Sequence, residues 1–238
     1  MQRYFVKNKE NNKFILEQSD IHHIKNVMRM NDKDKIEVVY EEKLYICEIN
    51  NVKDNLEVTL LEEKIDNNEL PIEITIAFSL VKEEKVDLIL QKCTELGISK
   101  FIPLEVSRCV VKIDKKKEMK KIDRWNNICK EASEQSKRNK VPEITEIKRL
   151  KDIINLDYDL KILCSVNQSV INIKKVLQNN TKCDKIIIVI GPEGGISIEE
   201  ENYLISNNFI PTSLGNRVLR TETAPIYVSS IINYEYME

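Results

Sequence analysis

The 238-residue sequence has little histidine, no paired-cysteine motif and no long hydrophobic run. Its two histidines are adjacent at positions 22 and 23, so we expect no zinc site of histidine and cysteine, and no other metal ion. The six cysteines form no C-x-x-C pair and lie mostly in apolar stretches, which favours reduced, buried thiols. No apolar run approaches the roughly 18 residues of a membrane span, and the first 14 residues contain no signal-peptide core. These absences predict a cytoplasmic protein with no membrane partner.

Glycine is also scarce, and its placement is informative. The chain has five glycines, well below the usual share of about 7 %. Glycine permits backbone conformations and close approaches that a side chain prevents. In a chain that avoids glycine elsewhere, a cluster of glycines therefore indicates a functional site. Four of the five gather between residues 191 and 215: Gly191, Gly194, Gly195 and Gly215.

The charge is balanced overall but uneven along the chain. There are 37 basic and 39 acidic residues, yet the stretch 108–140 has 12 basic residues against 5 acidic ones. Such a stretch is either a solvated helix face or a contact for the nucleic-acid backbone, which needs clustered positive charge whatever the net charge. The length and the 42 % of hydrophobic residues predict one large domain or two unequal ones.

Hydrophobic periodicity divides the chain near residue 70. Before it, short alternating stretches predict strands at 35–40, 43–49 and 55–61, and Ser19 is a plausible N-cap for one helix. This pattern is typical of a small β-barrel-like module, and the polar stretch 65–71 is its expected linker. After it, strands and helices alternate, which predicts a mainly parallel sheet covered on both faces. The expected strands are 72–80, 100–106, 160–166, 185–190 and 209–214, and the expected helices are 84–96, ended by Gly97, and 117–137.

The glycine cluster follows a buried strand and precedes a helix. The segment GPEGG (191–195) lies between IIIVI and a capping box formed by Ser197 and Glu200. It matches neither common phosphate-binding glycine motif, and the carboxylate of Glu193 would repel a phosphate. The segment is therefore either an ordinary strand-to-helix turn or a loop that accepts hydroxyls, amines or a cation.

A second polar loop, NRVLRTET, begins after Gly215 and ends where a helix is expected to start, near 223–225. One interpretation is helix capping with an arginine–glutamate ion pair. The other is a substrate loop that faces the GPEGG segment. In that case Arg217 and Arg220 would contact nucleic acid or stabilise developing negative charge, and Glu222 would orient them.

These two segments resemble the paired signature of the RsmE family. GPEGG at 191–195 and LGNRVLRTETA at 214–224 carry the resemblance, and further segments agree in order: HHIKNVMRM (22–30), QKCTELGISKFIPL (91–104), SRCVVK (107–112), RW (124–125) and EASEQSKRNKVPEI (131–144). The family consists of bacterial methyltransferases of the SPOUT superfamily that modify N3 of a uridine in 16S ribosomal RNA. One departure is visible, because the family usually has Gly-Asp where this chain has Lys33-Asp34.

The resemblance implies an α/β fold with a SPOUT-type parallel sheet. Residues 1–70 would form a PUA-like β-barrel RNA-binding domain, and residues 71–238 a methyltransferase domain with a C-terminal trefoil knot. It further implies S-adenosylmethionine as cofactor, a homodimer, and the 16S rRNA of the small ribosomal subunit as partner. By position, the cofactor pocket would consist of Leu163, Cys164, Ser165, Gly191, Pro192, Glu193, Gly194, Gly195, Leu214, Gly215, Val218, Leu219 and Arg220.

The chemistry of such a reaction suggests roles for individual residues. Uridine N3 must lose its proton before it attacks a sulfonium methyl group, and the resulting negative charge spreads onto the flanking carbonyl oxygens. We expect Arg220 to be catalytic, Glu222 to orient it or accept the proton, and Glu193 to be the second candidate acceptor. No metal is needed. RNA contacts are expected along the basic stretch and in the N-terminal domain, at Arg3, Arg29, Arg108, Arg138 and Arg217.

Three alternatives stay open. A related enzyme of the same superfamily could methylate a ribose 2′-hydroxyl or another base, although LRTETA differs from the asparagine-containing segment of many 2′-O enzymes. A non-catalytic RNA-binding ribosome-assembly protein would lack cofactor affinity. A globular protein whose basic helix is merely solvated would lack RNA affinity at low salt. The sequence does not define a dimer interface, but the final apolar helix (226–232) is a candidate.

Overall fold

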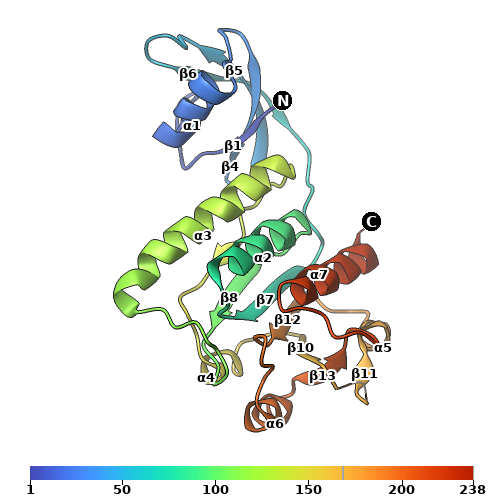
Figure 1. Cartoon of the computed structure of the whole chain (residues 1–238). Helices are drawn as coiled ribbons and strands as arrows, with labels where there is room; N and C mark the ends of the chain where they lie inside the picture. Colours follow the sequence, from blue (N-terminus) through green and yellow to red (C-terminus); the bar gives the residue numbers. More distant parts are fainter. Residues whose placement is uncertain (168, 238) are drawn as a thin grey trace. The chain divides into compact units, whose positions relative to one another are not determined.

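The computed structural model describes residues 1–167 and 169–237, which form two compact units. The first unit contains Met1–Glu69 together with Ser133–Lys140, and the second contains Leu70–Ala132 and Val141–Glu238. Figure 1 shows the first unit as a sheet with one short helical segment and the second as alternating strands and helices. The hydrophobic periodicity changes near residue 70, and the structure places Glu69 in the first unit and Leu70 in the second.

The first unit is built on a six-stranded sheet with the strand order β1-β4-β5-β6-β3-β2. The strand β1 pairs with β4 in parallel, and the other pairs are antiparallel. Two of the three predicted strands match to within one residue, and the third begins and ends later than expected. The bounds are β1 Arg3–Phe5, β2 Asn8–Glu10, β3 Lys13–Ile15, β4 Lys35–Tyr40, β5 Lys43–Asn50 and β6 Glu57–Lys64.

The helical segment of the first unit differs from the prediction at its start. The helix α1 spans Gln18–His22 and continues as a π-helical turn, His23–Val27. Glu17 takes the N-cap position with extended backbone, and Ser19 lies inside the helix. The predicted Ser19 cap is therefore wrong. Ile24 is fully buried in the core of this unit, so packing rather than capping positions the segment.

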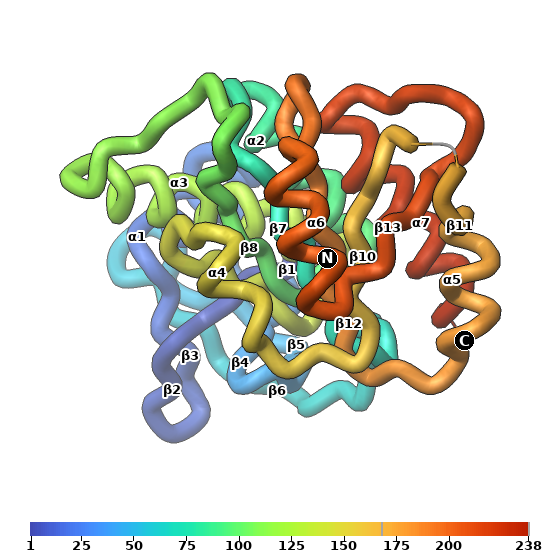
Figure 2. Tube along the Cα trace, turned by 90° about the horizontal axis from the view of Figure 1, so that it is seen from below, coloured from blue at the N-terminus to red at the C-terminus, as the bar shows by residue number. Residues whose placement is uncertain are grey.

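The second unit contains a seven-stranded sheet with the order β11-β13-β10-β12-β7-β8-β9. Every neighbouring pair is parallel, which confirms the predicted parallel sheet. The two central strands β7 and β12 are almost entirely buried, as their unbroken apolar runs predict. Figure 2 shows β7, β10, β12 and β13 next to one another. The bounds of the strands in this sheet are β7 Glu73–Ser79, β8 Lys100–Leu104, β9 Glu143–Ile144, β10 Leu160–Ser165, β11 Ile171–Asn172, β12 Lys185–Ile190 and β13 Ile210–Ser213.

Helices connect the strands and cover the sheet. Their bounds are α2 Glu83–Glu95, α3 Lys115–Gln135, α4 Leu150–Ile153, α5 Ile173–Asn179, α6 Ile198–Ser206 and α7 Thr223–Tyr236. Gly97 ends α2 with φ +91°, a conformation that favours glycine. The last helix, α7, packs beside α2 (Figure 1). Its apolar residues Val228 and Ile232 are fully buried in the core of this chain.

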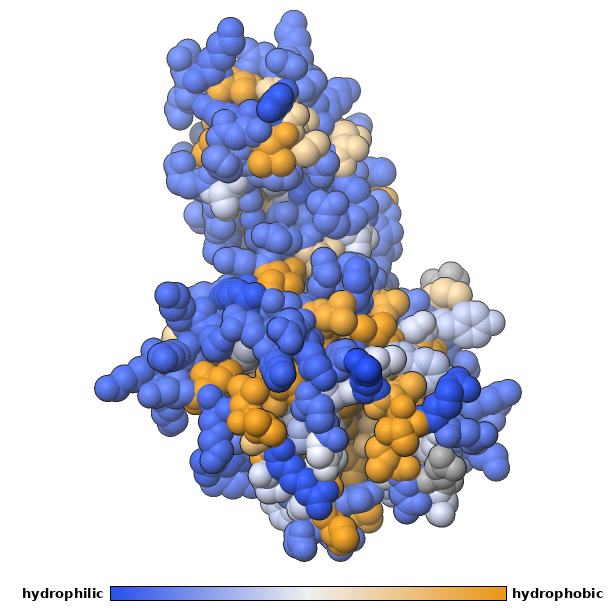
Figure 3. All heavy atoms as spheres, viewed as in Figure 1, coloured by the Kyte–Doolittle hydropathy of each residue, from blue (hydrophilic) through white to orange (hydrophobic). Residues whose placement is uncertain are grey.

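The long helix α3 has two unlike faces. Ile122, Trp125 and Cys129 recur at helical spacing and are buried in the core of the second unit. Hydrophilic atoms dominate the surface along α3 in Figure 3. The helix begins two residues earlier than predicted and ends at Gln135, because Lys137 takes a left-handed conformation with φ +62°. Most of the basic stretch is therefore one helix with one core-facing stripe.

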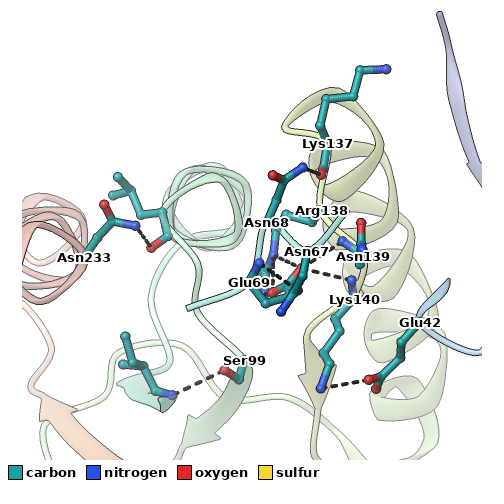
Figure 4. Close-up of polar contacts among 12 residues, drawn as sticks. Glu42, Asn67, Asn68, Glu69, Ser99, Lys137, Arg138, Asn139, Lys140 and Asn233 are labelled. Atoms are coloured by element: carbon teal, nitrogen blue, oxygen red, sulfur yellow. Dashed lines mark hydrogen bonds and ion pairs between the residues drawn. The ribbon is translucent and has the colours of Figure 1, made fainter. Parts of the chain in front are cut away.

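The residues that follow α3 belong to the first unit, although the sequence suggested the second domain. Glu69 accepts hydrogen bonds from the Arg138 guanidinium, from the Asn139 amide at 2.8 Å and from the Lys140 amide at 3.0 Å. Figure 4 shows these three donors around the Glu69 carboxylate. The side chains of Glu69 and Arg138 are only 10 % and 4 % exposed. The ion pair between Glu69 and Arg138 is buried and joins residues that are far apart in the sequence. The hydrophobic periodicity therefore could not predict that residues 133–140 belong to the first unit.

Candidate active site

Three loops meet at one edge of the parallel sheet. They follow β10, β12 and β13, which are neighbours in the sheet, so their carboxyl ends lie together. Figure 2 shows the three loops at the same edge. Between them lies a cavity of about 620 Å³, lined by all thirteen residues that the sequence suggested for a cofactor pocket. Further lining residues include Lys85, Arg108, Val166, Ile190, Ile196, Glu201, Arg217, Thr221 and Ala224.

The loop 191–195 has a backbone that tolerates few side chains. A Cβ atom on Gly191 would lie 3.0 Å from Cγ1 of Ile196 and 3.1 Å from its amide nitrogen. Gly195 has φ +70°, and its amide donates to the carbonyl of Pro192 at 2.8 Å, which closes a tight turn. The glycines are therefore required by close packing at one position and by backbone conformation at the other.

The helix α6 begins with the predicted capping box. Ser197 Oγ accepts from the Glu200 amide at 3.2 Å, and the Glu200 carboxylate accepts from the Ser197 amide at 3.1 Å. The same carboxylate accepts from the amide and the hydroxyl of Ser107, at 2.7 and 2.8 Å. Burial raises the pKa of Glu200, but the hydrogen bonds from the two serines outweigh it and keep the pKa below its usual value. Glu200 thus joins the loop that follows β8 to the start of α6 as a carboxylate.

The loop 214–222 is attached to the glycine loop. Gly215 has φ +125°, a conformation that favours glycine, and the chain turns there after the end of β13. The hydroxyl of Thr221 donates to the carbonyl of Gly191 at 2.6 Å. Arg217, Val218 and Arg220 are exposed and line the cavity. The two segments, which one interpretation of the sequence placed opposite each other, therefore contact each other directly.

A lysine connects the two loops a second time. The ammonium of Lys85, in the first turn of α2, lies 2.9 Å from Oε1 of Glu193 and 3.0 Å from Oε2 of Glu222. Hydrogen bonds to the two carboxylates raise the pKa of Lys85. The hydrogen bond from Lys85 lowers the pKa of Glu193. All three groups are therefore charged at neutral pH.

The position of Glu222 bears on its predicted role. Burial raises the pKa of this carboxyl, but hydrogen bonds from its own amide and from Lys85, and the charges of Lys85 and Arg220, lower it further than burial raises it. A carboxyl with a lowered pKa is a weak proton acceptor. Lys85 carries no motif in the sequence, where it is one of many charged residues of an amphipathic helix. Only its position across the cavity distinguishes it.

The five arginines expected to contact RNA have different surroundings. Arg108 and Arg217 are exposed and line the cavity, and Arg108 also donates to the carbonyl of Gly194 at 2.8 Å. Arg29 is exposed on the first unit. Arg3 and Arg138 are 2 % and 3 % exposed. Their predicted contact with RNA is not supported, because both guanidinium groups are buried in bonds within the first unit.

The interior partners of Arg3 explain its burial. Its guanidinium donates to Glu37 Oε2 at 3.0 Å and to Asn139 Oδ1 at 2.7 Å, and it also reaches the backbone carbonyl of Arg138 at 3.0 Å. A guanidinium with this many partners stabilises the fold of the first unit. No local pattern in the sequence indicates this role, since the partners are 34 and 136 residues away.

Some of the positive charge on α3 is neutralised by α2. Lys121 pairs with Glu83 at 3.1 Å, and Arg124 pairs with Glu83 at 2.9 Å and with Asp87 at 2.5 Å. Exposed lysines remain at the start of the helix and just before it: Lys112, Lys115, Lys116, Lys117 and Lys120. The described residues include no group of three or more histidine, cysteine, aspartate or glutamate side chains that could hold a metal ion. Among those residues, no helix is long and apolar enough to cross a membrane.

Comparisons with known proteins agree with this arrangement. Residues 68–233 match the family model of an RNA methyltransferase domain, and residues 16–61 match that of an RNA methyltransferase PUA domain. The ribosomal RNA small subunit methyltransferase E of Bacillus subtilis is 38 % identical over 99 % of this chain and 97 % of its own. That of Aquifex aeolicus is 30 % identical over 98 % of this chain and 99 % of its own.

Solved structures show the same likeness. A Legionella pneumophila protein, described as a methyltransferase in complex with bound SAM, is 30 % identical with a TM-score of 0.89 and covers 98 % of this chain and 96 % of its own. The ribosomal RNA small subunit methyltransferase E of Neisseria gonorrhoeae, bound to S-adenosyl methionine, is 27 % identical with a TM-score of 0.89, over 98 % and 97 %. These matches confirm the predicted fold class, a SPOUT-type α/β domain preceded by a PUA-like domain. The chain belongs to the ribosomal RNA small subunit methyltransferase E family, the RsmE family that its motifs resemble.

Proposed function

We propose that this protein is an S-adenosylmethionine-dependent methyltransferase that methylates N3 of a uridine in the 16S rRNA of the small ribosomal subunit. The observation that carries the proposal is the cavity at the carboxyl ends of β10, β12 and β13, built by the two family-specific loops. Full-length relatives named for small-subunit rRNA methylation, and similar structures that hold the cofactor, support it.

The lining of the cavity fits S-adenosylmethionine. Its volume of about 620 Å³ lies in the usual range for sites that enclose a small molecule. Leu163, Leu214 and Leu219 offer apolar surface for an adenine ring, and the glycine loop offers bare backbone. The carboxylates of Glu193 and Glu201 suit the positive charges of the sulfonium and the amino group. When bound, the cofactor supplies the electrophilic methyl group.

The residues of this chain would then prepare the uracil base. Arg220 is exposed at the cavity, where its guanidinium can donate to the uracil carbonyl oxygens and stabilise the charge that develops when N3 loses its proton. Lys85 forms an ion pair with one oxygen of each of the carboxylates Glu222 and Glu193, which makes both weaker proton acceptors. We therefore assign Arg220 the main catalytic role and keep Glu222, the more buried carboxylate, ahead of Glu193 as acceptor.

RNA would be held by exposed cations on each unit. Arg29 on the first unit, and Arg108, Arg217 and the lysines near the start of α3 on the second, are accessible. Paired uracil hides N3, so the target is expected to be unpaired. Replacing Lys116 or Lys117 with glutamine should reduce the slope of log affinity against log salt by about 1 each, as filter binding can measure. An unchanged slope would exclude that lysine from the interface.

The domain roles and the assembly are part of the same proposal. Residues 1–70 would serve RNA binding and residues 71–238 catalysis, with the knot that the resemblance implies in the C-terminal part. The protein would act in the cytoplasm, with its ribosomal substrate, as a homodimer. Since the apolar face of α7 is already buried within the chain, only its outward side, with Tyr227 and Tyr234, is available for a partner. Light scattering of the purified protein tests the dimer.

The test of the function is a methyl-transfer assay. Labelled S-adenosylmethionine is incubated with small ribosomal subunits that lack the modification, and the product nucleoside is identified by mass spectrometry. N3-methyluridine is the expected product, and Arg220→Ala should lower the rate more than roughly tenfold. Arg149→Ala, at an exposed arginine outside the cavity, is the matched control. Detection of another methylated nucleoside would mean that the enzyme acts on a different position of the RNA. No methyl transfer at all would favour a non-catalytic RNA-binding protein.

A further inference from the structure

The bridge made by Lys85 joins three segments that are far apart in the sequence. Lys85 lies in the first turn of α2, Glu193 lies in the glycine loop after β12, and Glu222 precedes α7. One ammonium group is within 3.0 Å of both carboxylates, so the two carboxylate oxygens are at most about 6 Å apart. Without a cation between them, two like charges at this distance repel each other.

The placement of Lys85 is unfavourable for its own helix. The first turn of a helix carries partial positive charge, which disfavours a lysine there. The side chain is only 23 % exposed and points toward the cavity that it lines. The contacts to Glu193 and Glu222 therefore offset a local disadvantage, which indicates a role beyond the stability of α2.

We propose that Lys85 is a positioning residue that fixes the glycine loop and the start of α7 relative to each other, and so keeps the cavity in the shape that binds the cofactor. The hydrogen bond from Thr221 to the Gly191 carbonyl connects the same two segments at the beginning of the glycine loop. Lys85 connects them again at Glu193, further along the loop. Two attachments restrict the rotation of the loop that a single one would permit. The part of this inference that concerns the cofactor rests on the proposed function.

The first experiment measures loop order without any cofactor. Hydrogen exchange, followed by mass spectrometry on the ligand-free protein, should be at least tenfold faster at 191–197 and 220–226 in Lys85→Met than in the wild type. Lys85→Arg should exchange as the wild type does, because a guanidinium can also donate to two carboxylates. Lys92→Met is the matched control, since Lys92 lies on the same helix but pairs with Glu95 of that helix.

The second experiment measures cofactor affinity. By calorimetry, Lys85→Met should bind S-adenosylmethionine at least tenfold more weakly, and Lys85→Arg should recover affinity to within about threefold of wild type. Adding Glu193→Gln to Lys85→Met should slow the hydrogen exchange of the ligand-free loop again, because it removes the repulsion between the carboxylates. A general loss of stability would not be reversed by this second change.

The outcomes separate the two proposals. Unchanged hydrogen exchange in both loops of a folded Lys85→Met protein would overturn the positioning role. Faster loop exchange in Lys85→Arg than in the wild type would overturn it as well. If the wild-type protein does not bind S-adenosylmethionine while exchange responds as expected, the positioning role stands and the proposed function fails. If Lys85→Met does not fold, the hydrogen exchange of the loop is compared between Lys85→Arg, which keeps both ion pairs, and Glu193→Gln, which weakens one of them. Equal exchange in these two variants would overturn the positioning role.

Discussion

The buried pair of Glu69 and Arg138 should contribute strongly to the stability of the first unit. Glu69→Ala removes the carboxylate that faces the Arg138 guanidinium and leaves the amides of Asn139 and Lys140 without their acceptor. Removing one partner of a buried pair typically lowers the free energy of unfolding by 3–5 kcal/mol. Arg138 keeps other contacts, so we expect about 3 kcal/mol, the lower end of that range.

Thiol labelling can measure this change in the first unit alone. Cys47 is fully buried there, whereas Cys93 and Cys129 are fully buried in the second unit. When opening and reclosing are fast compared with labelling, the labelling rate follows the population of the open form, so a loss of about 3 kcal/mol corresponds to roughly a hundredfold faster labelling of Cys47. The labelling of Cys93 and Cys129 should change much less. Peptide mass spectrometry distinguishes the three sites.

The control for this prediction is an exposed ion pair in the same unit. Lys43 and Glu63 lie 3.7 Å apart with side chains 62 % and 52 % exposed, so Glu63→Ala should lower the free energy of unfolding by less than about 1 kcal/mol. Its Cys47 labelling should stay within about fivefold of wild type. If Glu69→Ala accelerates the labelling of Cys47 by no more than this control does, the assignment of residues 133–140 to the first unit through Glu69 is refuted.

Three further predictions concern single positions. Lys33 is exposed with φ +74°, so Lys33→Gly should raise the free energy of unfolding of the first unit by about 0.5–1 kcal/mol in urea titrations. Burial raises the pKa of Glu37, but hydrogen bonds from Arg3 and a neighbouring lysine lower it further, so the pKa lies below its usual 4.5. The stability from Glu37 is thus complete above pH 4.5 and lost as the pH falls through the lowered pKa, and Glu37→Gln should flatten this acid loss. Gly191→Ala should weaken S-adenosylmethionine binding at least tenfold by calorimetry, because its Cβ meets backbone at 3.1 Å, whereas Gly194→Ala should change it less than threefold.

Each of these predictions has an outcome that contradicts it. Lys35→Gly, in the regular strand β4, should destabilise the first unit, so equal effects of Lys33→Gly and Lys35→Gly would refute the strain at Lys33. Equal acid sensitivity of the wild type and Glu37→Gln would show that the pair with Arg3 does not contribute. Similar affinities of the two glycine variants would contradict the close packing at Gly191.

Local patterns in the sequence were sufficient for most of the second unit. The β-branched run at 185–190 predicts a buried strand, and Ser197 with Glu200 predicts the start of α6, because both signals involve residues a few positions apart. The four clustered glycines and the 214–224 segment indicate the site, and they line one cavity. The family resemblance adds an expectation for the whole chain. The strand, the helix start and the glycine turns could be predicted because short-range geometry determines them.

Only the tertiary structure decided which charged residues are partners. Lys85 and Glu193 are 108 residues apart, and nothing in their own segments predicts that they meet. Arg3 and Arg138, expected to face RNA as exposed cations, are buried because Glu37, Glu69 and Asn139 complete their hydrogen bonds. A charged side chain is equally compatible with solvent, a ligand or a buried partner, and long-range packing selects among the three. The sequence therefore determined where the candidate site lies, and the fold determined which side chains are available to it.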